Sequence, residues 1–91
     1  MMLQLEIKVA GRVQGVGFRY FVKNKADEFN ITGWVRNSRN GGVEIVAEGN
    51  KSDLETFVSW VKQGPPLSRV DKLFVNWFEK SSGFTIFEIR F

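Results

Sequence analysis

A glycine-rich segment set between two different periodic patterns most constrains how this chain folds. Residues 3–9 alternate apolar and polar side chains, which predicts a strand with one buried face. Over residues 18–29, apolar residues recur at three-to-four spacing, which predicts an amphipathic helix. The segment between them, residues 11–19, is Gly-Arg-Val-Gln-Gly-Val-Gly-Phe-Arg. Its three glycines let the backbone turn tightly from strand to helix and come close to a ligand.

After the first helix, the sequence predicts two strands, a second helix and two further strands. Asn30 is a plausible left-handed residue at the end of the first helix, and Asn40-Gly41 predicts a hairpin. Ser52 and Glu55 form a capping-box pattern that predicts a helix start, and Gly64 ends that helix. The predicted strands after the first helix cover 31–39, 43–48, 69–78 and 84–91.

This order of elements fits an α+β, ferredoxin-like βαββαβ sandwich with two helices on one face of an antiparallel-type five-stranded sheet. A length of 91 residues suits one hydrophobic core, so we expect a single domain over 1–91. In this topology the first and second strands run the same way with the third between them. Two strand spacings then separate the loop after the first strand from the end of the second by about 9–10 Å. Residues 11–19 and Asn37 can therefore serve one site.

Composition excludes several kinds of chemistry. The chain has no cysteine and no histidine, so thiolate nucleophiles, zinc–thiolate sites and histidine general bases are ruled out. No apolar run approaches the roughly 20 residues that span a bilayer, and the N-terminal residues lack a signal-peptide pattern. We therefore expect a cytoplasmic protein without a membrane partner. The net charge of +3 favours anionic ligands but does not by itself indicate nucleic acid.

The glycine-rich loop is a candidate phosphate-binding site. The backbone N–H groups of Gly15, Val16, Gly17, Phe18 and Arg19 precede or open the predicted helix, where such groups are unpaired and attract anions. The planar guanidinium of Arg19 suits bidentate bonding to phosphate oxygens. The alternative is a tight strand–helix connection with Arg19 solvated.

Asn37, at the end of the predicted second strand, is a candidate for holding a water molecule. A neutral carboxamide both accepts and donates hydrogen bonds, so it can orient a nucleophilic water without titrating. Asparagine is also common as a cap or turn residue, and Asn37 precedes Asn40-Gly41. Chemistry alone leaves these two readings equal.

The absence of histidine favours a substrate whose leaving group is already a stable anion. A carboxylate, whose conjugate acid has a pKa near about 4, needs no general acid to leave. The mixed anhydride of a carboxylic and a phosphoric acid is such a substrate, and its own phosphate could accept the proton of the attacking water. The sequence thus leads to the hypothesis of acyl phosphate hydrolysis.

Two blocks of residues resemble the signature blocks of the acylphosphatase family. They are Gly11-Arg12-Val13-Gln14-Gly15-Val16-x-Phe18-Arg19 and Gly33-Trp34-Val35-Arg36-Asn37, and the resemblance extends over essentially the whole chain. It implies metal-independent hydrolysis of acyl phosphates to carboxylate and phosphate, with no cofactor. By matched position, Arg19 and the loop N–H groups of residues 15–19 would bind the phosphoryl group, and Asn37 would orient the water. Gly17 occupies a variable slot of the pattern, and Asn40 stands where aspartate is frequent.

Two alternatives compete with a free acylphosphatase. The first is a carbamoyl-phosphate-specific module, like the acylphosphatase-like domain at the start of hydrogenase maturation proteins; the length of this chain favours the free enzyme. The second is an RNA-binding module of the same βαββαβ layout, which needs stacking aromatics on its central strands. The first strand instead carries Gln4, Glu6 and Lys8 on its polar face. We therefore expect a small-molecule acyl phosphate as partner, with no nucleic acid, and a monomer, with a weak dimer as the alternative.

Overall fold

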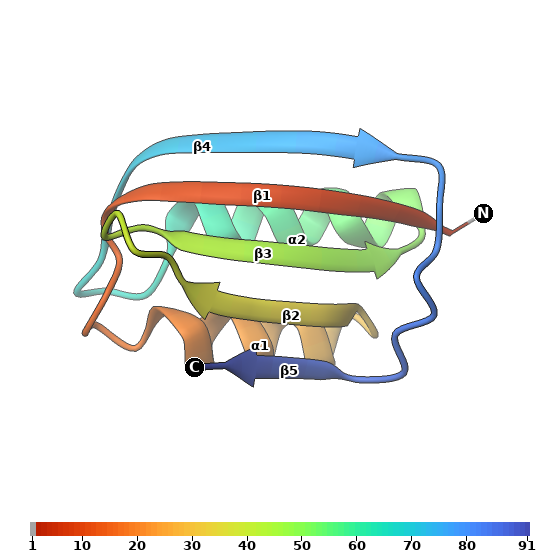
Figure 1. Cartoon of the computed structure of the whole chain (residues 1–91), viewed down its shortest axis with the longest axis horizontal. Helices are drawn as coiled ribbons and strands as arrows, with labels where there is room; N and C mark the ends of the chain where they lie inside the picture. Colours follow the sequence, from red (N-terminus) through yellow and green to blue (C-terminus); the bar gives the residue numbers. More distant parts are fainter. Residues whose placement is uncertain (1) are drawn as a thin grey trace.

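The computed structural model describes residues 2–91 as one five-stranded sheet with both helices on the same face (Figure 1). The strand order is β4-β1-β3-β2-β5, which places β3 between β1 and β2 as predicted. The elements are β1 (Leu3–Arg12), α1 (Phe18–Glu28), β2 (Thr32–Asn37), β3 (Val43–Gly49), α2 (Lys51–Gln63), β4 (Arg69–Phe78) and β5 (Phe87–Arg90). The predicted ferredoxin-like arrangement of two helices on one face of a sheet is confirmed.

The sheet is antiparallel from β4 to β2 and parallel where β5 joins β2. The antiparallel-type sheet predicted from the sequence thus acquires one parallel pair at its edge. The predicted final strand over 84–91 is too long, because the β2–β5 pairing begins only at Gly33 and Phe87. Residues 84–86 belong to the connection from β4, and the carbonyl of Ile86 at its end accepts a hydrogen bond from the N–H of Gly33 in β2 at 2.9 Å.

The core lies between the sheet and the helices. The inward residues of β1, which are Leu5, Ile7 and Val9, are at most 3% exposed. From the helices, Phe18 and Phe57 are among the largest side chains that are fully buried. The period-2 and three-to-four patterns of the sequence therefore did identify the buried faces.

The residues that end α1 and α2 are those predicted from the sequence, but the residue that caps the start of α2 is not. Asn30 adopts a left-handed conformation with φ of 56° just after α1, and Gly64 caps the C-terminus of α2, both as predicted. The N-cap of α2 is Asn50, whose side-chain oxygen accepts a hydrogen bond from the backbone N–H of Asp53 at 2.9 Å. The Ser52 capping box is therefore wrong, because Asn50 already occupies the cap position.

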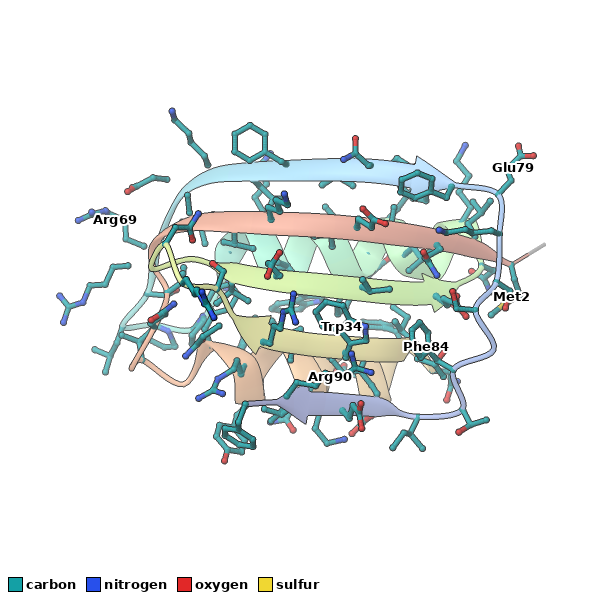
Figure 2. The ribbon with its side chains drawn as sticks, viewed as in Figure 1. Met2, Trp34, Arg69, Glu79, Phe84 and Arg90 are labelled. Atoms are coloured by element: carbon teal, nitrogen blue, oxygen red, sulfur yellow. The ribbon has the colours of Figure 1, made fainter. Side chains whose placement is uncertain are left out.

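The topology brings two loops together at one end of the strands, which is called here one edge of the sheet. The loop from β1 to α1 and the turn from β2 to β3 lie at the same edge, on the left in Figure 1. Arg69, labelled at that edge in Figure 2, opens β4 there. The connection from β4 to β5 crosses the opposite edge, where Glu79 and Met2 are labelled. Neither helix within residues 2–91 is long and apolar enough to cross a membrane.

Candidate phosphate-binding site

The loop over residues 13–17 is anchored on both sides by buried side chains. Val13 and Phe18, which flank its glycines, are each 1% exposed. Gly15 and Gly17 have φ of 74° and 79°, the left-handed region that side-chain-bearing residues rarely adopt. Placing left-handed residues beside right-handed ones turns successive N–H groups into one concavity. The two glycines are thus required by the backbone path, and the anchors hold that path in place.

The N–H groups of this loop have no partner within residues 2–91. None of the backbone nitrogens from Gly15 to Arg19 donates a hydrogen bond, to backbone or to side chain, among the described residues. The first helical bond at this end runs from the N–H of Phe21 to the carbonyl of Gly17 at 3.1 Å. Gly17 is the N-cap of α1 and has no side chain to satisfy these donors. Free N–H groups and the positive end of the helix dipole together attract an anion.

Arg19 lies in the first turn of α1 and is directed toward the end of β5. Its Nη1 donates to the backbone oxygen of Arg90 at 3.3 Å, and its guanidinium carbon lies 4.7 Å from the centre of the Phe91 ring. A guanidinium has five N–H donors, so this single long hydrogen bond leaves most of its donors free. The contacts with β5 were not predicted from the sequence, because they join residues more than seventy positions apart.

Asn37 is the last residue of β2, which ends two residues before the predicted end at Arg39, and its side-chain oxygen is buried without a hydrogen-bond partner among the described residues. Within residues 2–91 only the Thr32 hydroxyl, at the other end of β2, shares this state. The turn that follows is capped by Asn40, whose Oδ1 accepts from the backbone N–H of Gly42 at 3.0 Å. The turn residue of this segment is therefore Asn40, and the carboxamide oxygen of Asn37 is left for another donor.

A groove beside Asn37 extends as far as Phe91, although Arg19 and the loop residues 13–17 do not line it. Its volume is about 680 Å³, and its lining includes Asn37, Arg39 and Phe91. Phe91 is the same residue whose ring lies under the Arg19 guanidinium. The pairing of β5 with β2 explains this proximity, since Arg90 lies opposite Arg36, one residue before Asn37. Arg90 and Trp34, both labelled in Figure 2, lie on these neighbouring strands, with the guanidinium 4.8 Å from the indole ring.

The charges at this edge are predominantly positive. Among the described residues 2–91, three arginines at this edge form no ion pair: Arg12, Arg19 and Arg39. Arg36 is paired with Glu44 at 3.1 Å, and Arg69 with Asp71 at 2.9 Å. Three unpaired guanidinium groups around one loop favour the approach of an anion.

Gln14 joins the two loops and was not predicted to have a role of its own. Its Nε2 donates to the backbone oxygens of Ser38 and Gly42, both at 2.8 Å. These oxygens belong to the turn that directly follows Asn37. Its place inside the glycine-rich segment, next to Gly15, was the only signal in the sequence.

Comparison with known proteins identifies the family to which the chain is similar. The family model for acylphosphatase matches residues 5–89. An acylphosphatase of Bacillus licheniformis is 48% identical over 90 residues, covering 99% of this chain and all of the relative. The crystal structure of acylphosphatase from Bacillus subtilis superposes with a TM-score of 0.96 at 47% identity, covering 98% of this chain and 99% of that one. Full-length HypF, in a phosphate- and nucleotide-bound form, matches with a TM-score of 0.92 at 35% identity over 12% of its length. The chain belongs to the acylphosphatase family.

Proposed function

We propose that residues 1–91 act as one domain that hydrolyses the carboxyl–phosphate bond of acyl phosphates, releasing carboxylate and phosphate. Family membership over nearly the whole chain supports this reaction. The single structural observation that carries the assignment of the site is the row of unpaired N–H groups from Gly15 to Arg19 at the start of α1. These donors and the positively charged Arg19 guanidinium complement the negatively charged oxygens of a phosphoryl group.

Arg19 and the loop N–H groups would bind the phosphoryl oxygens and neutralise their charge. Phosphoryl transfer depends mainly on such positioning and neutralisation. Asn37 would orient the attacking water through its side-chain carboxamide, which can both donate and accept a hydrogen bond. The water oxygen forms the new bond to phosphorus as the bond from phosphorus to the acyl oxygen breaks. The carboxylate leaves on the side opposite the water, and a phosphoryl oxygen takes the proton of the water.

This mechanism asks for no metal ion, because the charge on the phosphoryl oxygens is met by Arg19 and the N–H groups. It asks for no general acid either, since a carboxylate leaves as a stable anion. We therefore expect hydrolysis to continue at full rate in the presence of a strong chelator. A loss of activity that is restored by a divalent cation would contradict this part of the proposal.

A phosphate-release assay with three substrates tests the proposed reaction. Benzoyl phosphate should be hydrolysed rapidly, and an alkyl phosphate monoester should be hydrolysed negligibly, because an alkoxide is a poor leaving group without a general acid. Carbamoyl phosphate, run in parallel, tests the alternative of a carbamoyl-phosphate-specific module. Turnover of carbamoyl phosphate alone would favour that alternative, and equal turnover of the monoester would contradict the proposed reaction class.

A further inference from the structure

We propose that Gln14 is a positioning residue for hydrolysis: it holds the turn after Asn37 against the phosphate-binding loop and so fixes where the attacking water is presented. This inference rests on the proposed function, and it assigns a role to a side chain that need not touch the substrate. Its basis is the pair of hydrogen bonds that Gln14 makes across the edge of the sheet.

The two bonds use the full donor capacity of one group. Nε2 of glutamine carries two hydrogens, and it meets two carbonyl oxygens, those of Ser38 and Gly42, each at 2.8 Å. Both distances lie within the range of about 2.7–3.2 Å that is usual for N–H···O hydrogen bonds. A donor held between two acceptors cannot move toward one without losing the other. The turn is therefore fixed in two directions by a single side chain.

The bonds join segments that have no strand pairing with each other. Gln14 follows β1, and Ser38 follows β2, and β3 separates these two strands in the sheet. The turn itself is closed by the N–H of Ser38 donating to the carbonyl of Gly42 at 2.9 Å. The same two residues that close the turn thus also accept from Gln14. A shift of the loop relative to the turn must break these bonds.

The consequence falls on Asn37, because it is bonded covalently to Ser38. Displacing catalytic groups by about 1 Å can lower a rate by about 100-fold. The phosphate-binding N–H groups of residues 15–19 move with Gln14, which is adjacent to Gly15. The side-chain carboxamide of Asn37 moves with Ser38. Loss of the bridge should therefore affect the step that needs both partners, which is attack by water, more than the binding of phosphate alone.

The experiment is a double-mutant cycle between Gln14→Met and Asn37→Ala, with kcat for benzoyl phosphate and the inhibition constant of inorganic phosphate as readouts. Gln14→Met keeps the size of the side chain but removes both donors. We expect kcat to fall about tenfold while the inhibition constant changes less than about twofold. In the Asn37→Ala background, Gln14→Met should lower kcat by less than about twofold, because there is no longer a held water to misplace.

Gln4→Met is the matched control, since Gln4 also bridges from β1 through Nε2, but at the opposite edge of the sheet, to Glu48 and Ser82. It should lower stability without changing kcat. An equal loss of kcat in Gln4→Met and Gln14→Met would show that the loss reports stability alone. An equal loss of kcat for Gln14→Met in both backgrounds would also overturn the proposal, and so would an unchanged kcat in Gln14→Met. The activity of the parent protein distinguishes these outcomes from a failure of the proposed function. In that case the parent protein itself would not hydrolyse benzoyl phosphate.

Gln14→Glu provides a second test if the methionine variant does not fold. Its charged carboxylate would face two carbonyl oxygens and repel them, whereas the protonated acid can donate one hydrogen bond. Because the two carbonyl oxygens disfavour the charged form, the pKa of a glutamate at this position should lie above the ordinary value of about 4.3. The kcat of Gln14→Glu relative to the parent protein should therefore rise as the pH falls through this region. A ratio that does not change with pH would contradict the proposed role.

Discussion

Gln4, near the start of β1, and Gln14, just after its end, each bridge to other strands or loops, but the polar groups around them differ in whether they have hydrogen-bond partners. At one end Gln14 joins the phosphate-binding loop to the turn after Asn37, and the nearby N–H groups and the Asn37 oxygen have no partners within residues 2–91. At the other end Gln4 donates to Glu48 at 2.6 Å, and Glu48 also accepts from the backbone N–H of Ser82 and from the Ser81 hydroxyl. Glu48 is only 1% exposed, yet both of its oxygens have donors.

This contrast separates a structural network from a ligand site. Buried polar groups normally find partners, so a satisfied cluster such as that around Glu48 needs no ligand. Unpaired donors held in place by buried anchors such as Val13 and Phe18 are already arranged for a ligand. Substitutions at the Glu48 end should therefore change stability and leave activity intact. Substitutions of Arg19 and Asn37 at the other end should lower activity and leave stability nearly unchanged.

The largest effect on activity is expected for Arg19→Gln. Removing a donor that stabilises a developing oxyanion typically costs about 100-fold or more in rate, and here a positive charge is lost as well. Steady-state kinetics with benzoyl phosphate should show at least this loss in kcat/KM, with the thermal midpoint nearly unchanged. Arg69→Gln is the matched control: it removes the same charge at the same edge of the sheet, but from a guanidinium bound to Asp71, whose hydrogen bond and charge raise the pKa of Arg69. Equal losses in the two variants would contradict a specific role for Arg19.

Asn37→Ala should lower kcat by about 100-fold, because the attacking water loses the group that orients it. Phosphate affinity, measured as competitive inhibition, should change little, since the loop N–H groups and Arg19 remain. A large loss of phosphate affinity with a nearly normal kcat would instead assign Asn37 to phosphate binding. Such a result would remove the water-holding role from the account.

Gly17→Ala and Gly83→Ala introduce the same backbone strain at opposite edges of the sheet, beside Gln14 and beside Gln4. The two glycines have φ of 79° and 76°, and a Cβ at either position would meet no atom within 4 Å. Each substitution should therefore cost about 1–2 kcal/mol from the left-handed conformation alone. Only Gly17→Ala should also weaken phosphate binding, by about tenfold, because its loop carries the N–H donors. Calorimetry of phosphate binding would check this, and equal affinities in the two variants would contradict it.

Glu48→Gln should have the smallest effect on activity. The amide retains one acceptor oxygen but turns its NH₂ group toward donors, so unfolding free energy should fall by about 1–3 kcal/mol. Denaturant unfolding would measure that loss, while kcat/KM should stay within about twofold of the parent value. A large drop in kcat/KM would show that the two ends are coupled, and the contrast between them would fail.

The sequence predicted the elements and the shared edge of the sheet, because these follow from local periodicity and from topology. It placed Arg19 in the first turn of α1 and Asn37 at the end of β2, where the structure has them. Gln4 shows where such reasoning stops. Alternation predicts a polar outer face for this residue, but it is 3% exposed, because it donates to Ser82 in the connection from β4.

Contacts between distant parts of the chain could not be read from the pattern. The bonds of Gln14 to the turn and of Arg19 to Arg90 depend on strand register and on how β5 joins β2 in parallel. Neither the spacing nor the composition carries that information. The roles of residues 15–19 and Asn37, the cytoplasmic location and the monomeric state stay predictions.

Phosphate binding by the loop can be measured by titrating the isotopically labelled protein with inorganic phosphate and following its amide signals by nuclear magnetic resonance. The backbone N–H signals of residues 15–19 should shift saturably, with an affinity that falls as salt is added and is lost in Arg19→Gln. Amides of that segment that stay unmoved while signals elsewhere shift, or undiminished binding by Arg19→Gln, would contradict phosphate binding by the loop.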